Sequence, residues 1–228
     1  MILAIDTATR TASVALYDDG VLDERTWRAP GAHTAHLVPN IAELLNRQGR
    51  VPGELAGLAV AIGPGSFTGL RIGLSVAKGF ALGLGLPIAA VPTLDVTFYP
   101  HRHAALPVWA AIEAGRGRVY AALYRPGLAP PAPTDYYHGP LAALPLPMAG
   151  NTGEALLCGE FDRRWLAPLL ERAGGRLTDV GPAAGLRRAG CLAEMGLARL
   201  AAGQAEDLAA LSPIYLSQPA GQTDGGRG

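Results

Sequence analysis

The chain has few cysteines, lysines and aromatic residues, and it has no net charge. Its 228 residues include two cysteines, a single lysine and 6% aromatic residues, and 19 basic residues balance 19 acidic ones. Two cysteines cannot build a disulfide framework, so we expect a reducing compartment. The balanced charge gives no overall attraction to nucleic acid or to an anionic membrane.

The sequence also predicts no targeting segment and no membrane-spanning segment. The N-terminus has no basic region followed by an apolar region, as a secretory signal has. The longest uncharged stretch near the middle, residues 79–94, is shorter than the roughly 20 residues of a membrane span, and Pro87 and Pro92 interrupt it. Because 49% of the residues are hydrophobic, the chain can form a buried core. We therefore expect a folded cytoplasmic protein that makes no membrane contact.

Strand-like and helix-like segments alternate along the chain in two similar halves. In the first half, residues 2–5 form an apolar run that ends at Asp6, and a turn and a second strand follow. In the second half, residues 108–112 form an apolar run that ends at Glu113, again followed by a turn and a strand. Strands covered by helices, twice over, predict an α/β protein made of two related halves.

The element boundaries follow from hydrophobic periodicity and from the positions of glycine and proline. Strands are predicted over residues 2–5, 13–17, 21–28, 58–62, 88–91, 108–112 and 119–124. Helices are predicted over residues 34–48, 68–84, 93–99, 152–158, 162–173 and 187–202, and residues 126–133 form a proline-rich loop. We place one domain at 1–103, a second at 104–217, whose end segment could return to the first domain, and a disordered tail at 218–228.

A glycine-rich segment, GPGSFTGLRIG at residues 63–73, lies between a predicted buried strand and a predicted helix. Its glycines allow positive φ angles, Ser66 or Thr68 can cap the helix, and amides at a helix N-terminus can bind an anion. The segment lacks the Gly-Lys-Ser/Thr of a Walker loop and the pattern G-x-G-x-x-G. Two interpretations stay open: a tight turn without a ligand, or an anion or nucleotide loop. The residues of that loop would be Asp6, Gly63, Gly65, Ser66 and Thr68.

The helix predicted over residues 68–84 is apolar on nearly all of its faces. Small residues recur every four positions along it, at Gly69, Gly73 and Ala77, and allow another helix to approach closely. A helix of this kind is buried on nearly all faces, and its own sheet covers one of them. Two interpretations stay open for the other side: the helix at 34–48 covers all of it, or another chain does.

Other residue patterns give weaker signals. His33 and His36 could face one way on a helix, but a metal site would need further ligands such as His101 and His103, so we favour polar surface histidines. The segment Gly115-Arg116-Gly117-Arg118 could hold a phosphate or a carboxylate, or it is a solvated hairpin turn. The absence of G-x-S-x-G and H-E-x-x-H motifs gives no support to hydrolase or metalloprotease chemistry.

Several motifs resemble those of the bacterial TsaB (YeaZ) family. The most specific is the segment 63–73, continued by Ala77-Lys78-Gly79, which matches the signature of that family. The other similar segments are 5–9 with 13–16, 33–34 with 37–41, 87–93, 112–114 with 117–120, and 213–216. The resemblance covers residues 1–125 well, 126–205 weakly and 211–217 as a short final segment. The chain departs from the family at Glu113-Ala114-Gly115, where the family tends to have Asp-Ala-Arg.

Membership of this family implies the actin/hexokinase-like (ASKHA) fold, an α/β fold of two related domains, each with a mixed sheet and covering helices. It also implies an accessory, non-catalytic function in making threonylcarbamoyladenosine next to the anticodon of tRNA. In that family the partner is the catalytic TsaD, which holds the metal and transfers the threonylcarbamoyl group, and the ATPase TsaE joins the pair. The chain would then bind no cofactor tightly, with ATP and metal on the partner subunits, and it would meet tRNA only through the complex.

The resemblance also implies where the partner binds, because helices of the first domain form the contact in such complexes. The catalytic relative has a His-x-x-x-His metal pair, whereas His33 and His36 are three positions apart here. The resemblance therefore predicts neither catalytic residues nor a metal site in this chain. The predicted partner-binding residues are His33, Leu37, Ile41, Leu44, Gly69, Leu70, Gly73, Leu74, Ala77 and Phe80.

A second function stays open on the sequence alone, namely an ATP-dependent phosphotransferase of the same fold acting on a small molecule. It would use Asp6 to orient a metal ion and residues 63–68 as a phosphate loop. Magnesium-dependent binding of ATP by the isolated chain distinguishes the two functions. The sequence also leaves open whether the chain alone forms a homodimer through its apolar helix.

Overall fold

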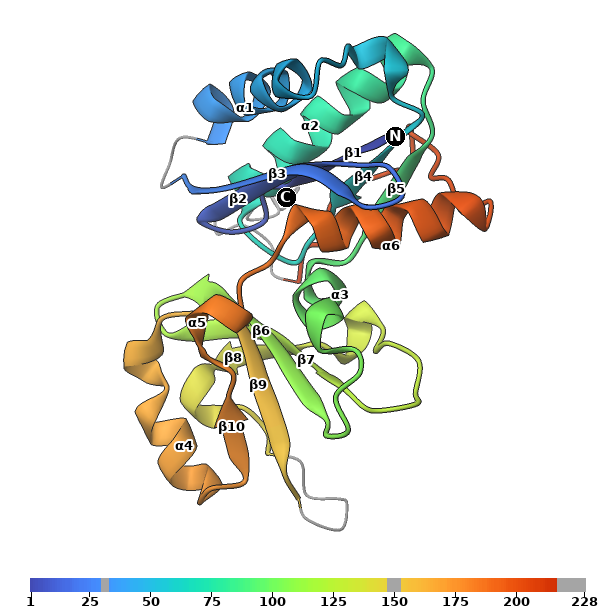
Figure 1. Cartoon of the computed structure of the whole chain (residues 1–228). Coiled ribbons are helices and arrows are strands. Elements are labelled where there is room, and N and C mark those ends of the chain that lie inside the picture. Colours follow the sequence, from blue (N-terminus) through green and yellow to red (C-terminus); the bar gives the residue numbers. More distant parts are fainter. Residues whose placement is uncertain (30–32, 147–152, 217–228) are drawn as a thin grey trace, which may run out of the picture.

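The computed structural model describes residues 1–29, 33–146 and 153–216, and the side chains of all of these except residues 33–35. The predicted tail at 218–228 lies outside the described residues, as does residue 152 of the helix predicted over 152–158. The chain forms two lobes, one above the other in Figure 1, and each lobe is built on a five-stranded sheet.

The two sheets have the same topology. The first contains β1 (Ile2–Asp6), β2 (Thr11–Tyr17), β3 (Val21–Arg28), β4 (Gly57–Ala61) and β5 (Ile88–Val91), in the order β3-β2-β1-β4-β5. The second contains β6 (Val108–Gly115), β7 (Arg118–Tyr124), β8 (Tyr137–Pro140), β9 (Ala155–Glu160) and β10 (Leu177–Asp179), in the order β10-β9-β6-β7-β8. In each sheet the first strand pairs antiparallel with the second and parallel with the fourth. The predicted plan of two related halves is therefore confirmed.

The helices cover both faces of both sheets. They are α1 (His33–Arg47), α2 (Phe67–Leu84), α3 (Thr93–Phe98), α4 (Ala167–Ala173), α5 (Gly181–Ala184) and α6 (Ala189–Ala201). Short 3-10 turns lie at Pro52–Glu54, Tyr99–His101, Pro133–Asp135, Leu141–Ala143 and Arg163–Trp165. Figure 1 shows α1 and α2 on the outer face of the first sheet and α4 on the outer side of the second, with α3 and α6 between the two sheets.

The structure corrects the predicted domain boundaries at two helices. Helix α3 was predicted to belong to the first domain, but Leu94 and Phe98 pack against β6 and β7 of the second sheet. Helix α6 was predicted to belong to the second domain, but Leu192 and Ala193 pack on the inner face of the first sheet. The return to the first lobe therefore starts at Ala189 rather than at the end segment, and the two lobes exchange one helix each.

Alternation of side chains along the central strand explains how the first lobe packs. Leu3 and Ile5 point to the face that α1 and α2 cover, whereas Ile2 and Ala4 point to α6, because successive strand residues face opposite sides. The α6 side carries small residues and lets the helix approach closely. A Cβ atom placed on Gly196 would lie 2.3 Å from the Cβ of Ala59.

Strand β9 corrects another prediction, because a helix was expected over residues 152–158. The segment Ala-Leu-Leu-Cys-Gly-Glu at Ala155–Glu160 has no helical period, and as a buried central strand it needs apolar residues on both faces. Its Gly159 has φ +126°, and a Cβ there would lie 1.8 Å from the carbonyl oxygen of Ala111. The run also ends in an acidic residue, as the two predicted first strands do.

Among the described residues, α2 is the one helix that could cross a membrane by its length and composition alone. In the structure it packs on β4 and β1, with α1 beside it. Only 33% of its residues are fully buried, however, so a large part of its surface is not covered by the chain itself.

Candidate functional site

The glycine-rich segment makes a tight turn whose backbone groups bind other parts of the same chain. The Gly63 amide donates to Oγ1 of Thr93 at 3.0 Å, and the Ser66 amide donates to the carbonyl oxygen of Ala8 at 2.7 Å. The Ser66 hydroxyl caps α2 by accepting from the Gly69 amide at 3.2 Å, as predicted for this residue. These contacts favour the interpretation of a turn without a ligand.

Close backbone approach explains the glycines at this turn. A Cβ on Gly63, which has φ +111°, would lie 2.7 Å from the carbonyl oxygen of Ile214 in the final segment. A Cβ on Gly65 would lie 2.3 Å from the carbonyl oxygen of Ala8. The backbone of Ile214 therefore lies against Gly63, whereas Thr68 is exposed.

Asp6, the other predicted member of the loop, forms a buried ion pair instead. The Nε atom of Arg187 donates to Oδ2 of Asp6 at 2.8 Å, and the side chains are 2% and 0% exposed. The second oxygen of Asp6 accepts from the Ala8 amide at 2.9 Å. Both oxygens are thus engaged within the chain, so the prediction of Asp6 as a free, metal-orienting acid is corrected.

Arg187 also binds the second lobe, through the carboxylate at the end of β9. Its Nη1 donates to Oε1 of Glu160 at 2.8 Å, and its Nη2 donates to Oγ1 of Thr9 at 3.1 Å. The Thr9 hydroxyl in turn donates to Oε2 of Glu160 at 2.9 Å. Asp6 and Thr9 come from the first lobe and Glu160 from the second, so the guanidinium closes the junction between the lobes.

The carboxylates of Asp6 and Glu160 stabilise the charged form of Arg187. Burial alone would lower the pKa of the guanidinium, but the carboxylates of Asp6 and Glu160 more than offset this effect and raise its pKa above the usual value. No sequence pattern predicted this residue, since it lies 181 positions from Asp6. Glu160 could have been found as the third acid that ends an apolar run.

A second polar cluster joins α3, β7 and α6 on the other side of the junction. The hydroxyl of Tyr124 donates to Oδ1 of Asp95 at 2.6 Å, and Nη2 of Arg199 lies 3.8 Å from Oδ2 of Asp95. Burial raises the pKa of the Asp95 carboxyl, although Tyr124 and Arg199 act in the opposite direction. The cluster links the two lobes, and no motif predicted it.

Most of the predicted partner-binding residues are buried inside the chain. Those fully covered are Leu37, Ile41, Leu44, Gly69, Leu70, Gly73, Leu74 and Ala77, whereas Phe80 is half-buried and the side chain of His33 lies outside the described part. A Cβ on Gly73 would lie 2.2 Å from Oγ1 of Thr7, and one on Gly69 would lie 2.1 Å from the Thr7 carbonyl oxygen. The choice of these eight residues as direct contacts is therefore corrected: they pack in the first lobe's own core.

A different set of α2 residues points away from the sheet. Ser75, Gly79 and Gly83 recur every four positions and are exposed, and Leu82 beside them is 71% exposed. On α1 the side chain of Val38 is 50% exposed. The interpretation in which α1 alone covers α2 is thus wrong. We call these five residues the outer helix face.

Among the side chains that the structure describes, the histidines and the second-half turn lie apart from one another. His36 is exposed on α1, whereas Nε2 of His101 lies 3.1 Å from the carbonyl oxygen of Ala184 at the lobe junction. Within the part of the chain that the structure describes, no group of three or more His, Cys, Asp or Glu side chains could hold a metal ion. The turn at Gly115–Arg118 is exposed, and the indole of Trp165 covers its Gly117.

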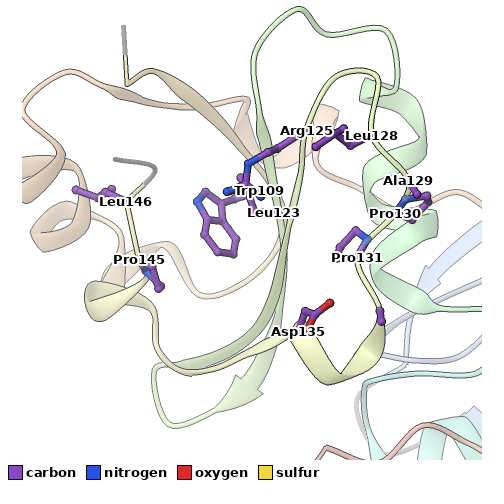
Figure 2. Close-up of a pocket in the computed structure, with 11 residues that line it drawn as sticks. Trp109, Leu123, Arg125, Leu128, Ala129, Pro130, Pro131, Asp135, Pro145 and Leu146 are labelled. Carbon is purple, nitrogen blue, oxygen red and sulfur yellow. The ribbon is translucent and has the colours of Figure 1, made fainter. Parts of the chain in front are cut away.

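A pocket of about 860 Å³ lies in the second lobe (Figure 2), and neither Asp6 nor Arg187 lines it. Its walls are Trp109, Leu123 and Leu146 on one side and the proline-rich loop with Pro130 and Pro131 on the other. The groups that the glycine-rich segment and Arg187 bring together lie elsewhere, so this pocket is not the candidate site.

The duplicated lobes, joined through the ends of their central strands, define a protein of the actin/hexokinase-like fold class. A sequence model of the family described as "TsaD: tRNA N6-adenosine threonylcarbamoyltransferase" matches residues 2–138. The chain belongs to this family, within its TsaB/YeaZ branch.

Three relatives show how far this similarity extends. The tRNA threonylcarbamoyladenosine biosynthesis protein TsaB of Escherichia coli is 42% identical over 126 residues, which cover 54% of each chain. TsaB of Bacillus subtilis is 38% identical over 125 residues, covering 54% of this chain and 55% of the relative. The chain thus spans about half the length of these curated relatives. The solved structure of YeaZ from Pseudomonas aeruginosa covers 94% of this chain and 99% of its own, with a TM-score of 0.76 and 26% identity.

Proposed function

We propose that this chain is a non-catalytic subunit in the biosynthesis of threonylcarbamoyladenosine in tRNA. The names of the E. coli and B. subtilis relatives support this process. In the proposal, the chain pairs in the cytoplasm with a TsaD-like catalytic subunit, which a TsaE-like ATPase joins. ATP and metal are held by those subunits. This chain stabilises the active form of its partner by binding that form more tightly than the inactive form.

The closed junction between the lobes is the observation that carries the non-catalytic part of the proposal. A phosphotransferase of this fold would need a free acid at the junction to orient a metal ion. Asp6 is fully buried and both of its oxygens accept hydrogen bonds, from Arg187 and from the Ala8 amide. A bound metal would have to displace a guanidinium that two carboxylates hold, which is costly in a buried site.

The outer helix face supports the pairing part of the proposal. A glycine inside a helix costs about 0.5–1 kcal/mol relative to alanine, and nothing lies within 4 Å of a Cβ placed on Gly79 or Gly83. The packing of the chain itself therefore gives no reason for these glycines. Their place beside the exposed Leu82 fits a surface onto which a helix of another subunit packs closely.

The pairing is tested by co-expressing the chain with a TsaD-like subunit and measuring the size of the complex. Leu82→Asp on the outer helix face should weaken the complex at least roughly fivefold, as the loss of an interface anchor does. Leu128→Asp is the matched control, because Leu128 is 68% exposed on the proline-rich loop of the other lobe and Leu82 is 71% exposed. Equal complex formation by both variants would reject this interface.

The phosphotransferase alternative has its own test. Isothermal titration of the isolated chain with ATP and magnesium should give no tight binding while the ion pair of Asp6 and Arg187 is intact. A tight, magnesium-dependent site would reject the non-catalytic proposal. Sizing of the chain alone over a range of concentrations shows whether two copies associate through the outer helix face when the partner is absent, and Leu82→Asp should then abolish that dimer.

A further inference from the structure

The turn between β6 and β7 carries an exposed aromatic platform. Trp165 is 47% exposed, whereas Trp109 is 6% exposed. A Cβ placed on Gly117 would lie 2.9, 3.0 and 3.3 Å from Cε2, Cδ2 and Nε1 of Trp165. These nearly equal distances place the face of the indole over the glycine, so the backbone supports one side of the ring and the exposed part faces solvent.

Arginines surround this indole. Arg116 lies at the tip of the turn and Arg118 at the start of β7, and both are exposed. Arg164, next to Trp165 in the chain, is 85% exposed and bound to Asp162. Hydrogen bonds from Arg164 are the main cause that lowers the pKa of Asp162, and the charge of Arg10 lowers it further, so Arg10 on the first lobe lies on the Asp162 side of this region. We call Arg10, Arg116, Arg118, Arg164 and Trp165 the Trp165 surface.

Positive charge exceeds negative charge at this place, although the whole chain is neutral. The acidic residues around the indole are Glu113, Asp162 and Asp179. Asp162 pairs with Arg164, and Asp179 pairs with Arg163. The side chains of Arg10, Arg116 and Arg118 form no ion pair with any residue that the structure describes, so three guanidiniums outnumber the one remaining carboxylate, that of Glu113.

We infer that the Trp165 surface binds a single-stranded segment of RNA. Exposed aromatic rings stack on unpaired bases, and arginines bind the phosphates that flank them. A stacking ring needs support on one face and access on the other, which the indole on Gly117 provides. The inference rests on the proposed function for its choice of RNA. It goes beyond the expectation that tRNA is met only through the complex.

The backbone of the turn supports a functional reason for the arginine at its tip. Arg116 has φ +54°, between Gly115 at +78° and Gly117 at +72°. A side chain in this left-handed region is unfavourable for most residues, and glycine or asparagine is the usual choice. An acidic protein would also be attracted by the arginines, but it would not need a flat aromatic ring, so the indole favours RNA.

The test measures the binding of a fluorescently labelled RNA hairpin by anisotropy. The probe is the anticodon stem-loop of a tRNA that reads codons beginning with A, and a duplex without a loop is the comparison. The full chain should bind the hairpin better than the duplex, and affinity should fall with salt with a log–log slope of about −2 for three phosphates. Arg116→Ala with Arg118→Ala, and separately Trp165→Ala, should each weaken binding at least roughly fivefold.

Matched variants keep the test sharp. Trp165→Tyr retains an aromatic ring and should retain most of the affinity. Arg125→Ala removes an exposed arginine directly after the far end of β7, about 23 Å from Arg118 along the chain, and should leave binding unchanged. Circular dichroism checks that each variant is folded.

Several outcomes would overturn the inference. These are binding that none of the Trp165-surface variants changes, equal binding of duplex and hairpin, or displacement of the hairpin by polyglutamate at equal charge concentration. Complex formation with the TsaD-like subunit is measured on the same variants. If the complex forms but the chain binds no RNA, the inference fails and the proposed function stands. If RNA binds but no complex forms, the proposed pairing fails and the inference about RNA stands.

Discussion

The two halves of the chain open with the same hairpin plan but use it differently. In the first hairpin, β1 and β2 pair in a regular register from Ile2 to Asp6, and Asp6 is buried. In the second hairpin, the register shifts between Glu113 and Gly115, and Glu113 is half-exposed. In the first turn, the backbone of Gly65 in the glycine-rich segment packs directly against Ala8 and leaves no space for a side chain. In the second turn, the indole of Trp165 lies on Gly117.

The difference shows that the same hairpin topology stabilises the lobe junction in the first lobe and presents an exposed turn in the second. The acid of the first hairpin is locked by Arg187 at the lobe junction, where it stabilises the closed arrangement. The corresponding acid of the second hairpin has no such partner among the described ion pairs, and its turn extends toward solvent. Substitutions in the first turn should therefore change stability, and those in the second should change binding.

The largest effect on stability is expected from removing the ion pair between Asp6 of the first hairpin and Arg187. Arg187→Met leaves the buried carboxylate of Asp6 and the partly buried carboxylate of Glu160 without their cation, and removal of one member of a buried pair costs about 3–5 kcal/mol. Urea unfolding should show a loss of this size. A loss below about 1 kcal/mol would mean that water already compensates these carboxylates.

Smaller effects on stability are expected from alanine substitutions on the two sides of α2. Gly69→Ala forces a methyl group against the carbonyl oxygen of Thr7 and should destabilise the chain by about 1–3 kcal/mol. Gly79→Ala on the outer helix face adds helix propensity in open space and should stabilise it by about 0.5–1 kcal/mol. Thermal unfolding of both variants measures the difference, and the same sign for both would contradict the assignment of inner and outer faces.

The second hairpin should respond in the opposite direction to the first. Arg116→Gly removes a side chain from a left-handed backbone position and should raise the free energy of unfolding by up to about 1 kcal/mol. Its RNA affinity should fall at the same time. Urea unfolding checks the first effect, and a clear destabilisation would show that Arg116 has a packing contribution of its own.

The smallest effect is a pH dependence from the cluster that links the lobes. The pKa of Asp95 is raised above its usual value of 3.8, mainly by burial. The stability that this group contributes is therefore full below pH 3.8 and is lost as the pH rises through the raised pKa. Asp95→Asn keeps an oxygen that can accept from Tyr124 and cannot ionise, so it should be more stable relative to wild type at pH 7 than at pH 4. A difference that does not change with pH would contradict this.

The fold was predictable because its signals are local or repeated. The strands before Asp6 and Glu113, the helices α1 and α2, and the similarity of the two halves all follow from short apolar patterns. Strand β9 was mistaken for a helix because its apolar run has no period, and it is its pairing with β6 and β10 that makes it a strand. The exchange of α3 and α6 between lobes depends on long-range packing, which no local pattern records.

The candidate site was less predictable for the same reason. The small residues of α2 were correctly seen as a place of close approach, but Gly73 approaches Thr7 of its own chain. Periodicity shows that small residues line one side of a helix, but it does not show which neighbour packs against that side. Arg187 and Trp165 are single residues whose meaning depends on partners far away in the sequence, Asp6 and Gly117.

Reconstituted modification of tRNA tests the central claim most directly. The assay combines a TsaD-like catalytic subunit, a TsaE-like ATPase, ATP, the threonylcarbamoyl donor and unmodified tRNA, and it measures threonylcarbamoyladenosine with and without this chain. The account predicts that the chain alone transfers nothing and that its addition raises the rate of modification by the catalytic subunit about tenfold or more, which corresponds to about 1.4 kcal/mol of activation free energy. Equal modification in its absence, or transfer by the chain alone, would contradict the account.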